Sequence, residues 1–266
     1  MVLTGGAGLL EPGRVTVERN RILSGVGASG PIIRLVQLSD LHLQEFDSHA
    51  EAVARRVNEL APHVLVITGD SIDRSDRLSV LAEFLGALEL RSSILATLGN
   101  WEHWAHVDLV ALEDTYARYG CTLLMNRTVT LDTGSTQVVV TGLDDSTGGR
   151  PDPRAALAGV PGTANHIVLA HSPAYRDALS AWVEQNAGAS QYRIACMLAG
   201  HTHGGQVNLF GWAPVRPPGS GRYVSGWYRE NGLPLYVSRG IGTSIAPIRL
   251  GAPPEISVFE WQTAAA

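Results

Sequence analysis

The chain has 266 residues, of which 45% are hydrophobic, so it is long and apolar enough to bury a sizeable core. Its formal net charge of −5, from 20 basic and 25 acidic residues, argues against a constitutive nucleic-acid-binding protein, which usually carries a basic face. No stretch approaches the roughly 20 apolar residues of a membrane span, and no signal-peptide pattern opens the chain, so we expect a soluble cytoplasmic protein.

The N-terminal part differs in texture from the rest. Residues 1–30 are rich in glycine, and we predict that they form an extension in which alternating Val15 and Val17 are compatible with an edge strand. Because no long linker follows, we expect residues 31–266 to form one domain. The cysteines Cys121 and Cys196 both lie in apolar runs, which favours buried free thiols over a disulfide.

From residue 31 to residue 120 the pattern alternates strands with helices. Apolar runs predict strands at 32–38, 64–68 and 93–98. Helical spacing follows each run: a helix with Ser48 as N-cap and Val53, Val57 and Leu60 on one side, then helices near 78–90 and 107–119. Repeated strand–helix units indicate a parallel sheet with covered faces.

After Gly120 the spacing becomes shorter. The runs 121–125, 127–132 and 137–143 are joined by short turns, which predicts antiparallel strands. The remaining expected elements are a helix at 174–186, strands at 194–200, 206–210, 234–238 and 255–261, and a loop at 211–233. Two packed sheets with helices outside are the simplest architecture.

Carboxylates, one amide and imidazoles come just after the apolar runs. These residues are Asp40, His42, Asp70, Asn100, His171, His201 and His203. Side chains at strand ends can converge on one edge of a sheet although they are far apart in sequence. This mixture of donors suits two adjacent divalent metals, and it predicts a dinuclear metal hydrolase.

The same residues carry a resemblance to the calcineurin-like metallophosphoesterases. The matching motifs are Asp40-Leu-His42, Gly69-Asp70-Ser-Ile-Asp73, Gly99-Asn100-Trp-Glu102, Ala170-His171 and Gly200-His201-Thr-His203-Gly204-Gly205-Gln206, within residues 32–261. The C-terminal motifs Tyr236-Val-Ser-Arg-Gly and Pro253-Pro254-Glu255-Ile256 are similar to a bacterial YkuE/YaeI-like subfamily of small, often membrane-associated phosphoesterases.

The resemblance implies a four-layered α/β/β/α sandwich and a set of metal ligands. One metal would take Asp40, His42, Asp70 and His203, and the other would take Asp70, Asn100, His171 and His201. Asp70 would bridge the two, and its charge would offset their repulsion. The histidines favour Mn, Fe or Zn over Mg, and Mn is the ion we expect in vitro. A hydroxide held by the metals would attack the phosphoester, so Asp70 and Asn100 count as catalytic residues too.

One position departs from the family pattern. The family usually has His directly after the Asn of the third motif, where it assists the leaving group, but here Trp101 stands. We expect His103 to supply the proton instead, with His106 and a purely structural role for both histidines as alternatives. Trp101 would form a wall for the substrate or pack in the core.

Several other polar residues lie near these motifs. Asp73 is suited to orient a ligand histidine or to close a turn, and Arg74 to hold a phosphate or to remain in solvent. Asp144 and Asp145 suit a turn better than the site. His49, His63 and His166 show no partner pattern.

We therefore expect a phosphoesterase that acts on a phosphomonoester or a phosphodiester, lipid-linked or nucleotide. The aromatic and proline-rich loop 211–233 follows the ligands, and it suggests an apolar entry and peripheral membrane contact. The alternatives are a nuclease or cyclic-nucleotide phosphodiesterase with the same metals, and a metal-holding binding protein without turnover. We expect no stable nucleic-acid complex.

Overall fold

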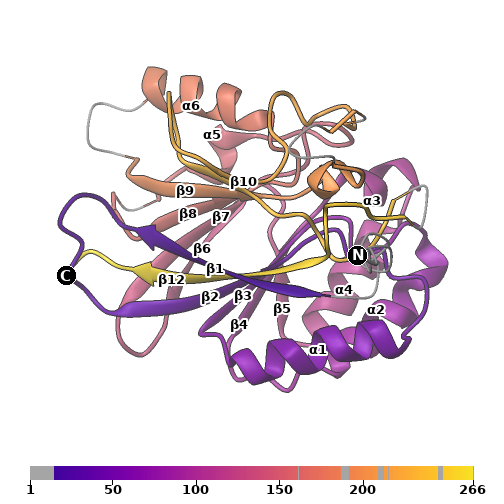
Figure 1. The fold of residues 1–266 in the computed structure, drawn as a ribbon. Helices are drawn as coiled ribbons and strands as arrows, with labels where there is room; N and C mark the ends of the chain where they lie inside the picture. Colours follow the sequence, from indigo (N-terminus) through magenta and orange to yellow (C-terminus); the bar gives the residue numbers. More distant parts are fainter. Residues whose placement is uncertain are drawn as a thin grey trace, which may run out of the picture.

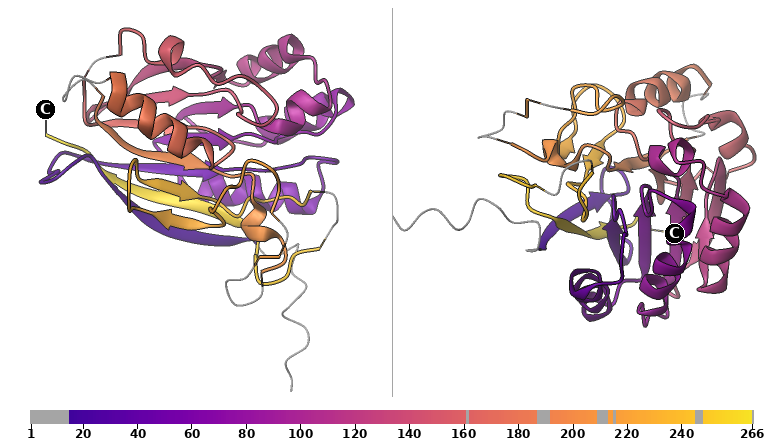
Figure 2. Two further views of the ribbon diagram at one scale, coloured as in Figure 1. Left: turned by 90° about the horizontal axis from the view of Figure 1, so that it is seen from above. Right: turned by 90° about the vertical axis from the view of Figure 1, so that its right-hand side faces the viewer.

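Two mixed β-sheets stack face to face in the computed structural model, which describes residues 15–160, 162–186, 192–208, 213–214, 216–244 and 248–265. Within these residues each sheet has six strands, and the helices lie on the outer faces (Figure 1). Two further views show the same arrangement, with strands inside and helices outside (Figure 2). This is the expected four-layered α/β/β/α sandwich.

The first sheet has the strand order β1-β12-β2-β3-β4-β5. In that order its strands are Thr16–Leu23, Glu255–Gln262, Ile32–Leu38, Val64–Thr68, Ser93–Thr97 and Cys121–Leu123. β12 is antiparallel to β2 and parallel to β1, and β2 to β5 are all parallel. The C-terminal ends of β2, β3 and β4 therefore lie at one edge.

The second sheet has the strand order β10-β11-β9-β8-β7-β6. In that order its strands are Gly226–Tyr228, Leu235–Val237, Ile194–Ala199, His166–Leu169, Gln137–Gly142 and Arg127–Asp132. The four central strands are parallel, and the two outer strands are antiparallel to their neighbours.

In the described part of the chain, five of the six α-helices cover the two outer faces, and α3 lies at the strand ends. The helices are α1 (Ser48–Leu60), α2 (Leu78–Gly86), α3 (Asn100–Trp104), α4 (Leu109–Arg118), α5 (Pro153–Ala156) and α6 (Tyr175–Asn186), with 3₁₀ turns η1 (Ser75–Arg77) and η2 (His203–Gly205). α1, α2 and α4 pack on the first sheet, and α5 and α6 pack on the second. Among the described residues, none of the helices combines the length and apolarity needed to cross a bilayer.

Alternation along the strands builds three apolar layers. Leu35 of β2 faces the second sheet, whereas its neighbour Val36 faces the helices of the first sheet. In the second sheet Ile167 faces inward and Val168 faces α6. Both faces of the central strands are buried, which is why these strands are continuous apolar runs rather than alternating ones.

The structure corrects four local predictions. Asp47, not Ser48, caps α1, because its carboxylate accepts hydrogen bonds from the first turn of the helix. β5 pairs in parallel with β4 and not with the antiparallel pair β6–β7, so 121–125 was assigned to the wrong neighbour. The predicted strand 206–210 starts after the 3₁₀ turn η2 and contains only an isolated bridge at Val207, and residues 209–210 lie outside the described residues.

The fourth correction concerns the loop predicted at 211–233, which contains the short strand β10. Residues 211, 212 and 215 lie outside the described residues, Trp212 among them. At the other end of the chain, β1 forms the edge of the first sheet, and residues 1–14 lie outside the described residues. The division of the chain at residue 30 stays a prediction. Cys121 and Cys196 are buried free thiols, as expected.

A buried histidine in the second sheet gives the fold a measurable pH dependence. His166 is 1% exposed and its Nε2 lies 2.8 Å from Thr141 Oγ1; burial lowers its pKa to about 4. Between pH 6.5 and pH 4 the unfolded chain therefore binds a proton at His166 that the folded protein does not bind. As the pH decreases through this window, the free energy of unfolding decreases by about 3 kcal/mol.

We expect His166→Gln to lack this component. Urea titrations give the free energy of unfolding of the parent minus that of the variant. This difference should be about 3 kcal/mol lower at pH 4 than at pH 7. Taking the difference cancels the other titrating groups. A difference that does not change with pH would mean that His166 titrates alike in both states.

Candidate metal centre

The predicted ligand residues all lie just past the C-terminal ends of strands, at one end of the sandwich. They are Asp40 and His42 after β2, Asp70 after β3, Asn100 after β4, His171 after β8, and His201 and His203 after β9. All of them are buried. Parallel pairing in both sheets brings these loops together although the residues are spread over much of the chain.

The carboxylates and imidazoles gather into two clusters. One contains Asp40, His42 and His203, the other Asp70, His171 and His201, and in each the candidate ligand atoms lie within 4.8 Å of one another. In the first cluster the Nε2 atoms of His42 and His203 are 3.1 Å apart. In the second, Nε2 of His171 is 3.2 Å from Nδ1 of His201.

The carboxylate of Asp70 faces both clusters. Its Oδ2 lies 3.1 Å from Nε2 of His171 and 3.7 Å from Nε2 of His42. Burial by itself would raise the pKa of Asp70, but His171 and His42 outweigh burial and lower the pKa below its ordinary value. Asp70 is therefore ionised and central to the set.

Three of the four histidines are oriented by a hydrogen bond from their other ring nitrogen. His42 Nδ1 donates to Asp73 Oδ1 (2.6 Å), His171 Nδ1 to the Thr68 carbonyl (2.7 Å) and His201 Nε2 to the Pro218 carbonyl (2.6 Å). Each bond aims the opposite nitrogen into its cluster, where the neutral ring offers a lone pair, and this is how proteins present imidazoles to a metal. The fourth, His203, has Arg249 Nη2 at 3.2 Å from Nδ1.

The donor set fits divalent cations. The side-chain oxygen of Asn100 is buried and has no hydrogen-bond partner among the described residues, which a folded protein tolerates poorly unless a ligand takes it. The facing imidazole nitrogens need a shared proton or a cation between them. Histidine with carboxylate and amide oxygens suits Mn, Fe or Zn.

Electrostatics separate the two imidazoles of the first cluster. Burial lowers the pKa of both, but the bond to Asp73 and the charge of Asp70 raise the pKa of His42 above its ordinary value. The pKa of His203 falls well below the ordinary value, because burial and the charges of His42 and Arg249 all disfavour protonation. The ring of His203 is therefore neutral at neutral pH.

The backbone at these residues is strained. Five of the seven have positive φ in the left-handed region: Asp40 (52°), His42 (45°), Asp70 (52°), His201 (72°) and His203 (50°). Residues other than glycine rarely adopt this backbone conformation, and such outliers cluster at functional sites. Gly99 is required for a different reason, since a Cβ there would collide with the Asp70 carboxylate.

Glu102 is a residue of the site whose role the sequence did not reveal. Its buried carboxylate accepts hydrogen bonds from the backbone nitrogens of Gly99, Asp70 and Ser71, at 2.8, 3.1 and 2.7 Å. Burial and the charge of Asp70 raise its pKa to about 7. Glu102 thus ties the loop after β3 to the loop after β4. The Gly99–Glu102 capping-box spacing was the available signal.

The residues around the departure at Trp101 also have defined places. Trp101 donates from Nε1 to Ser244 Oγ (3.2 Å), and its ring meets that of His42 edge-on at 6.3 Å. His103 Nε2 lies 2.6 Å from Asp144 Oδ1. His106 is exposed. Of the two histidines, His103 is the one held by a carboxylate.

The other polar candidates divide between turn and partner roles. Asp144 accepts a hydrogen bond from the backbone nitrogen of Arg150 and also lies against His103. It therefore stabilises the turn and is a partner of His103. Asp145 accepts from the hydroxyl of Ser172, next to His171. Arg74 pairs with Asp76 at the surface, the solvent role foreseen for it.

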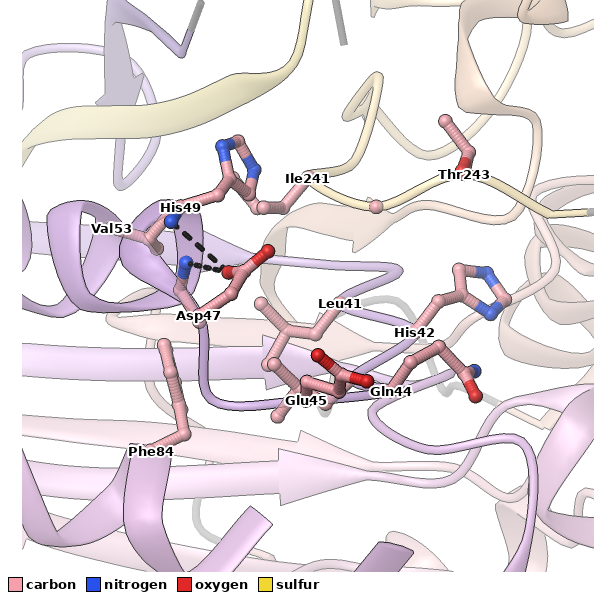
Figure 3. Close-up of a pocket in the computed structure, with 13 residues that line it drawn as sticks. Leu41, His42, Gln44, Glu45, Asp47, His49, Val53, Phe84, Ile241 and Thr243 are labelled. Atoms are coloured by element: carbon pink, nitrogen blue, oxygen red, sulfur yellow. Dashed lines mark hydrogen bonds between the residues drawn. The ribbon is translucent and has the colours of Figure 1, made fainter. Parts of the chain in front are cut away.

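Two cavities open near the clusters. One, of about 450 Å³, is lined by Asp70, Asn100, His201 and His203 together with Trp101. The other, of about 390 Å³, lies between α1 and the loop after β2, where Asp47 caps the helix (Figure 3). Only His42 of the predicted ligands lines that second cavity, so the first is the entrance to the clusters.

Asp73 offers a test of the orienting bonds. We expect Asp73→Asn to weaken Mn²⁺ binding about 10- to 100-fold. The neutral amide of the variant no longer offers a negative charge to the hydrogen bond that His42 Nδ1 donates. Calorimetric titration of metal-free protein measures the effect. Asp76→Asn, which removes a carboxylate three residues away at the surface, is the matched control. Equal affinities in the two variants would contradict a role for Asp73.

Comparison with known proteins agrees with this geometry. Residues 33–205 match the family model of calcineurin-like phosphoesterases. This chain belongs to the calcineurin-like phosphoesterase family. Its members use divalent metals, so the chain is a metal-dependent phosphoric ester hydrolase, and the resemblance seen in the sequence is confirmed. The alternative of a metal-holding protein without turnover loses its support.

Individual relatives span nearly the whole phosphoesterase chain. It is 30% identical to the uncharacterized metallophosphoesterase YkuE of Bacillus subtilis over 97% of this chain and 91% of the relative. It is 28% identical to the phosphodiesterase YaeI of Escherichia coli, covering 94% and 89%. It is 26% identical to the UDP-2,3-diacylglucosamine pyrophosphatase LpxG of Chlamydia muridarum, covering 85% and 83%.

Proposed function

We propose that this phosphoesterase hydrolyses a phosphomonoester or phosphodiester at a centre of two divalent cations that share Asp70. The observation that carries the proposal is the position of Asp70 Oδ2, which faces a histidine of each cluster at 3.1 and 3.7 Å. The proposed ligands are Asp40, His42, Asp70 and His203 for one cation, and Asp70, Asn100, His171 and His201 for the other.

The cations would supply a water deprotonated near neutral pH and positive charge for the phosphoryl oxygens. The chain's own residues hold this chemistry in place. Asp73, Thr68 and Pro218 fix the rings of three histidines, and Glu102 fixes the two loops that carry Asp70 and Asn100. Asn100 adds an oxygen dipole without a further negative charge.

His103 is the proposed general acid. Its hydrogen bond to Asp144 raises its pKa above the ordinary value, although burial opposes this, and the charge of Asp144 adds to the rise. A protonated ring that donates from Nε2 to Asp144 still has its Nδ1 proton to give to a leaving group. His103 follows Asn100 by one helical turn on α3.

The relatives support a small or lipid-linked phosphoester as substrate. YaeI is named a phosphodiesterase, and LpxG a pyrophosphatase of UDP-2,3-diacylglucosamine. By extension we propose peripheral contact with a membrane through 211–233. A nucleotide remains the alternative substrate, and the charge of −5 argues against long nucleic acids.

Two measurements on purified protein test the proposal. Metal-free protein should gain activity against bis-p-nitrophenyl phosphate when Mn²⁺ is added, and elemental analysis should find about two transition ions per chain. Parallel titrations with Fe²⁺ and Zn²⁺ rank the metals. One ion per chain at saturation would contradict the shared carboxylate, and metal-replete protein without turnover would contradict hydrolysis.

A further inference from the structure

The cavity at the metal centre has one polar end and one apolar wall. Asp70, Asn100, His201 and His203 form the polar end. Tryptophans, prolines and a valine form most of the wall: Trp101, Trp104, Val207, Pro214, Pro217 and Pro218. With about 450 Å³, the cavity has the size of a site for a small molecule.

Several polar groups on the wall make hydrogen bonds within the protein. Ser244 Oγ accepts from Trp101 Nε1 (3.2 Å), and Thr202 Oγ1 donates to the Val224 carbonyl (2.5 Å). Arg216 donates to the Gly221 carbonyl (2.9 Å). Because these groups are engaged and most of the lining is apolar, the wall suits an apolar group better than the edge of a base or a sugar.

Trp104 stands out on this wall because it is large, apolar and 46% exposed. Its ring meets that of Trp101 edge-on at 6.0 Å, so the two indoles form one continuous surface beside the clusters. Apolar surface of this kind that adjoins a polar site commonly marks a binding groove.

The geometry points to an alkyl or acyl chain, carried by the phosphoester substrate, as the occupant of this wall. This alkyl or acyl chain would lie along Trp101, Trp104 and the prolines, while the phosphoryl group of the substrate lies at Asp70. This assignment rests on the proposed hydrolase function and adds to it the part of the substrate that is recognised. It makes substrate preference depend on apolar length, because each buried methylene strengthens binding up to about 4-fold.

The test uses p-nitrophenyl phosphodiesters whose second ester is methyl, butyl or octyl. With Mn²⁺, kcat/KM should rise with chain length, by about 100-fold or more from methyl to octyl. A binding measurement accompanies it: in calorimetry, octylphosphonate should bind about 100-fold more tightly than methylphosphonate, with a negative heat-capacity change.

Variants of the wall locate the effect. Trp104→Ala should reduce the octyl-to-methyl preference about 10-fold, and Trp104→Phe should keep most of it, because a phenyl ring still covers the chain. Met125→Ala is the matched control, since Met125 is an exposed apolar side chain outside this cavity. It should leave the preference unchanged.

Equal kcat/KM values and equal phosphonate affinities along the series would overturn the inference and leave the hydrolase function standing. A p-nitrophenyl ester of thymidine 5′-phosphate preferred over the octyl ester, with Trp104→Ala lowering that preference, would also overturn it in favour of a stacked base. No hydrolysis of any ester would instead contradict the proposed function. The phosphonate titration would then still show whether the wall binds an alkyl chain.

Discussion

Asp70→Asn is expected to lower kcat for bis-p-nitrophenyl phosphate by roughly 10³-fold, because two cations would lose their shared negative charge. The variant's amide oxygen can still accept the hydrogen bond that Trp101 N donates to Asp70 Oδ1, so the loop after β4 should keep its place. The loss should therefore come from the metals and not from unfolding. Steady-state kinetics over a range of Mn²⁺ concentrations measures it.

Metal content separates this explanation from others. Elemental analysis of Asp70→Asn should show fewer than two ions per chain at a concentration that saturates the parent protein. Asp132→Asn, which changes a surface carboxylate at the end of β6, is the charge-matched control. Full activity in Asp70→Asn, or full loss of activity in the control, would refute a bridging role.

His103→Gln is expected to slow poor leaving groups selectively. With an alkyl leaving group, which must be protonated as it departs, kcat should fall about 100-fold, whereas p-nitrophenolate departs without a proton and its release should slow by less than about 3-fold. Hydrolysis of an alkyl phosphate and of a p-nitrophenyl phosphate by the same preparations gives the two rates. His106→Gln, an exposed histidine on the same segment, is the control.

The pH dependence of the alkyl reaction has a defined sign. The acid acts when His103 is protonated, so this activity should fall as the pH rises through the pKa of His103, which Asp144 holds above the ordinary value of 6.5. Asp144→Asn removes the charge that raises this pKa, and the falling limb should move to lower pH. A limb that stays in place in Asp144→Asn would assign the proton to another group.

The sequence predicted the central strands well because their physics is local. A run such as 64–68 is apolar on both faces, and a carboxylate follows it within two residues. Consecutive residues therefore indicate both that the strand is buried and that its end is polar. β5 could not be placed in this way. It has three residues, and whether it joins β4 or β6 depends on contacts between distant segments.

The site shows the same division. Spacing and residue type were enough to name the candidate ligands, but not to show that Glu102 would bind the loop of Asp70 or that His103 would pair with Asp144. Those contacts join residues 31 to 41 positions apart, and they exist only after the strands have aligned. The role of Trp101 was equally open, and its contacts with Ser244 and His42 make it a wall of the cavity.

By itself, then, the sequence determined the family, the layered fold and the seven candidate ligand residues, because each depends on composition within a few residues of a strand end. The resemblance implied which side chains share a cluster and that Asp70 stands between the two clusters, but only the tertiary structure gives their distances, the bonds that orient them and the apolar surface that adjoins them. The physical reason is that distances of 3 to 4 Å between imidazoles and carboxylates are set by how two sheets pack, and sheet packing is the sum of many long-range contacts that no short motif contains.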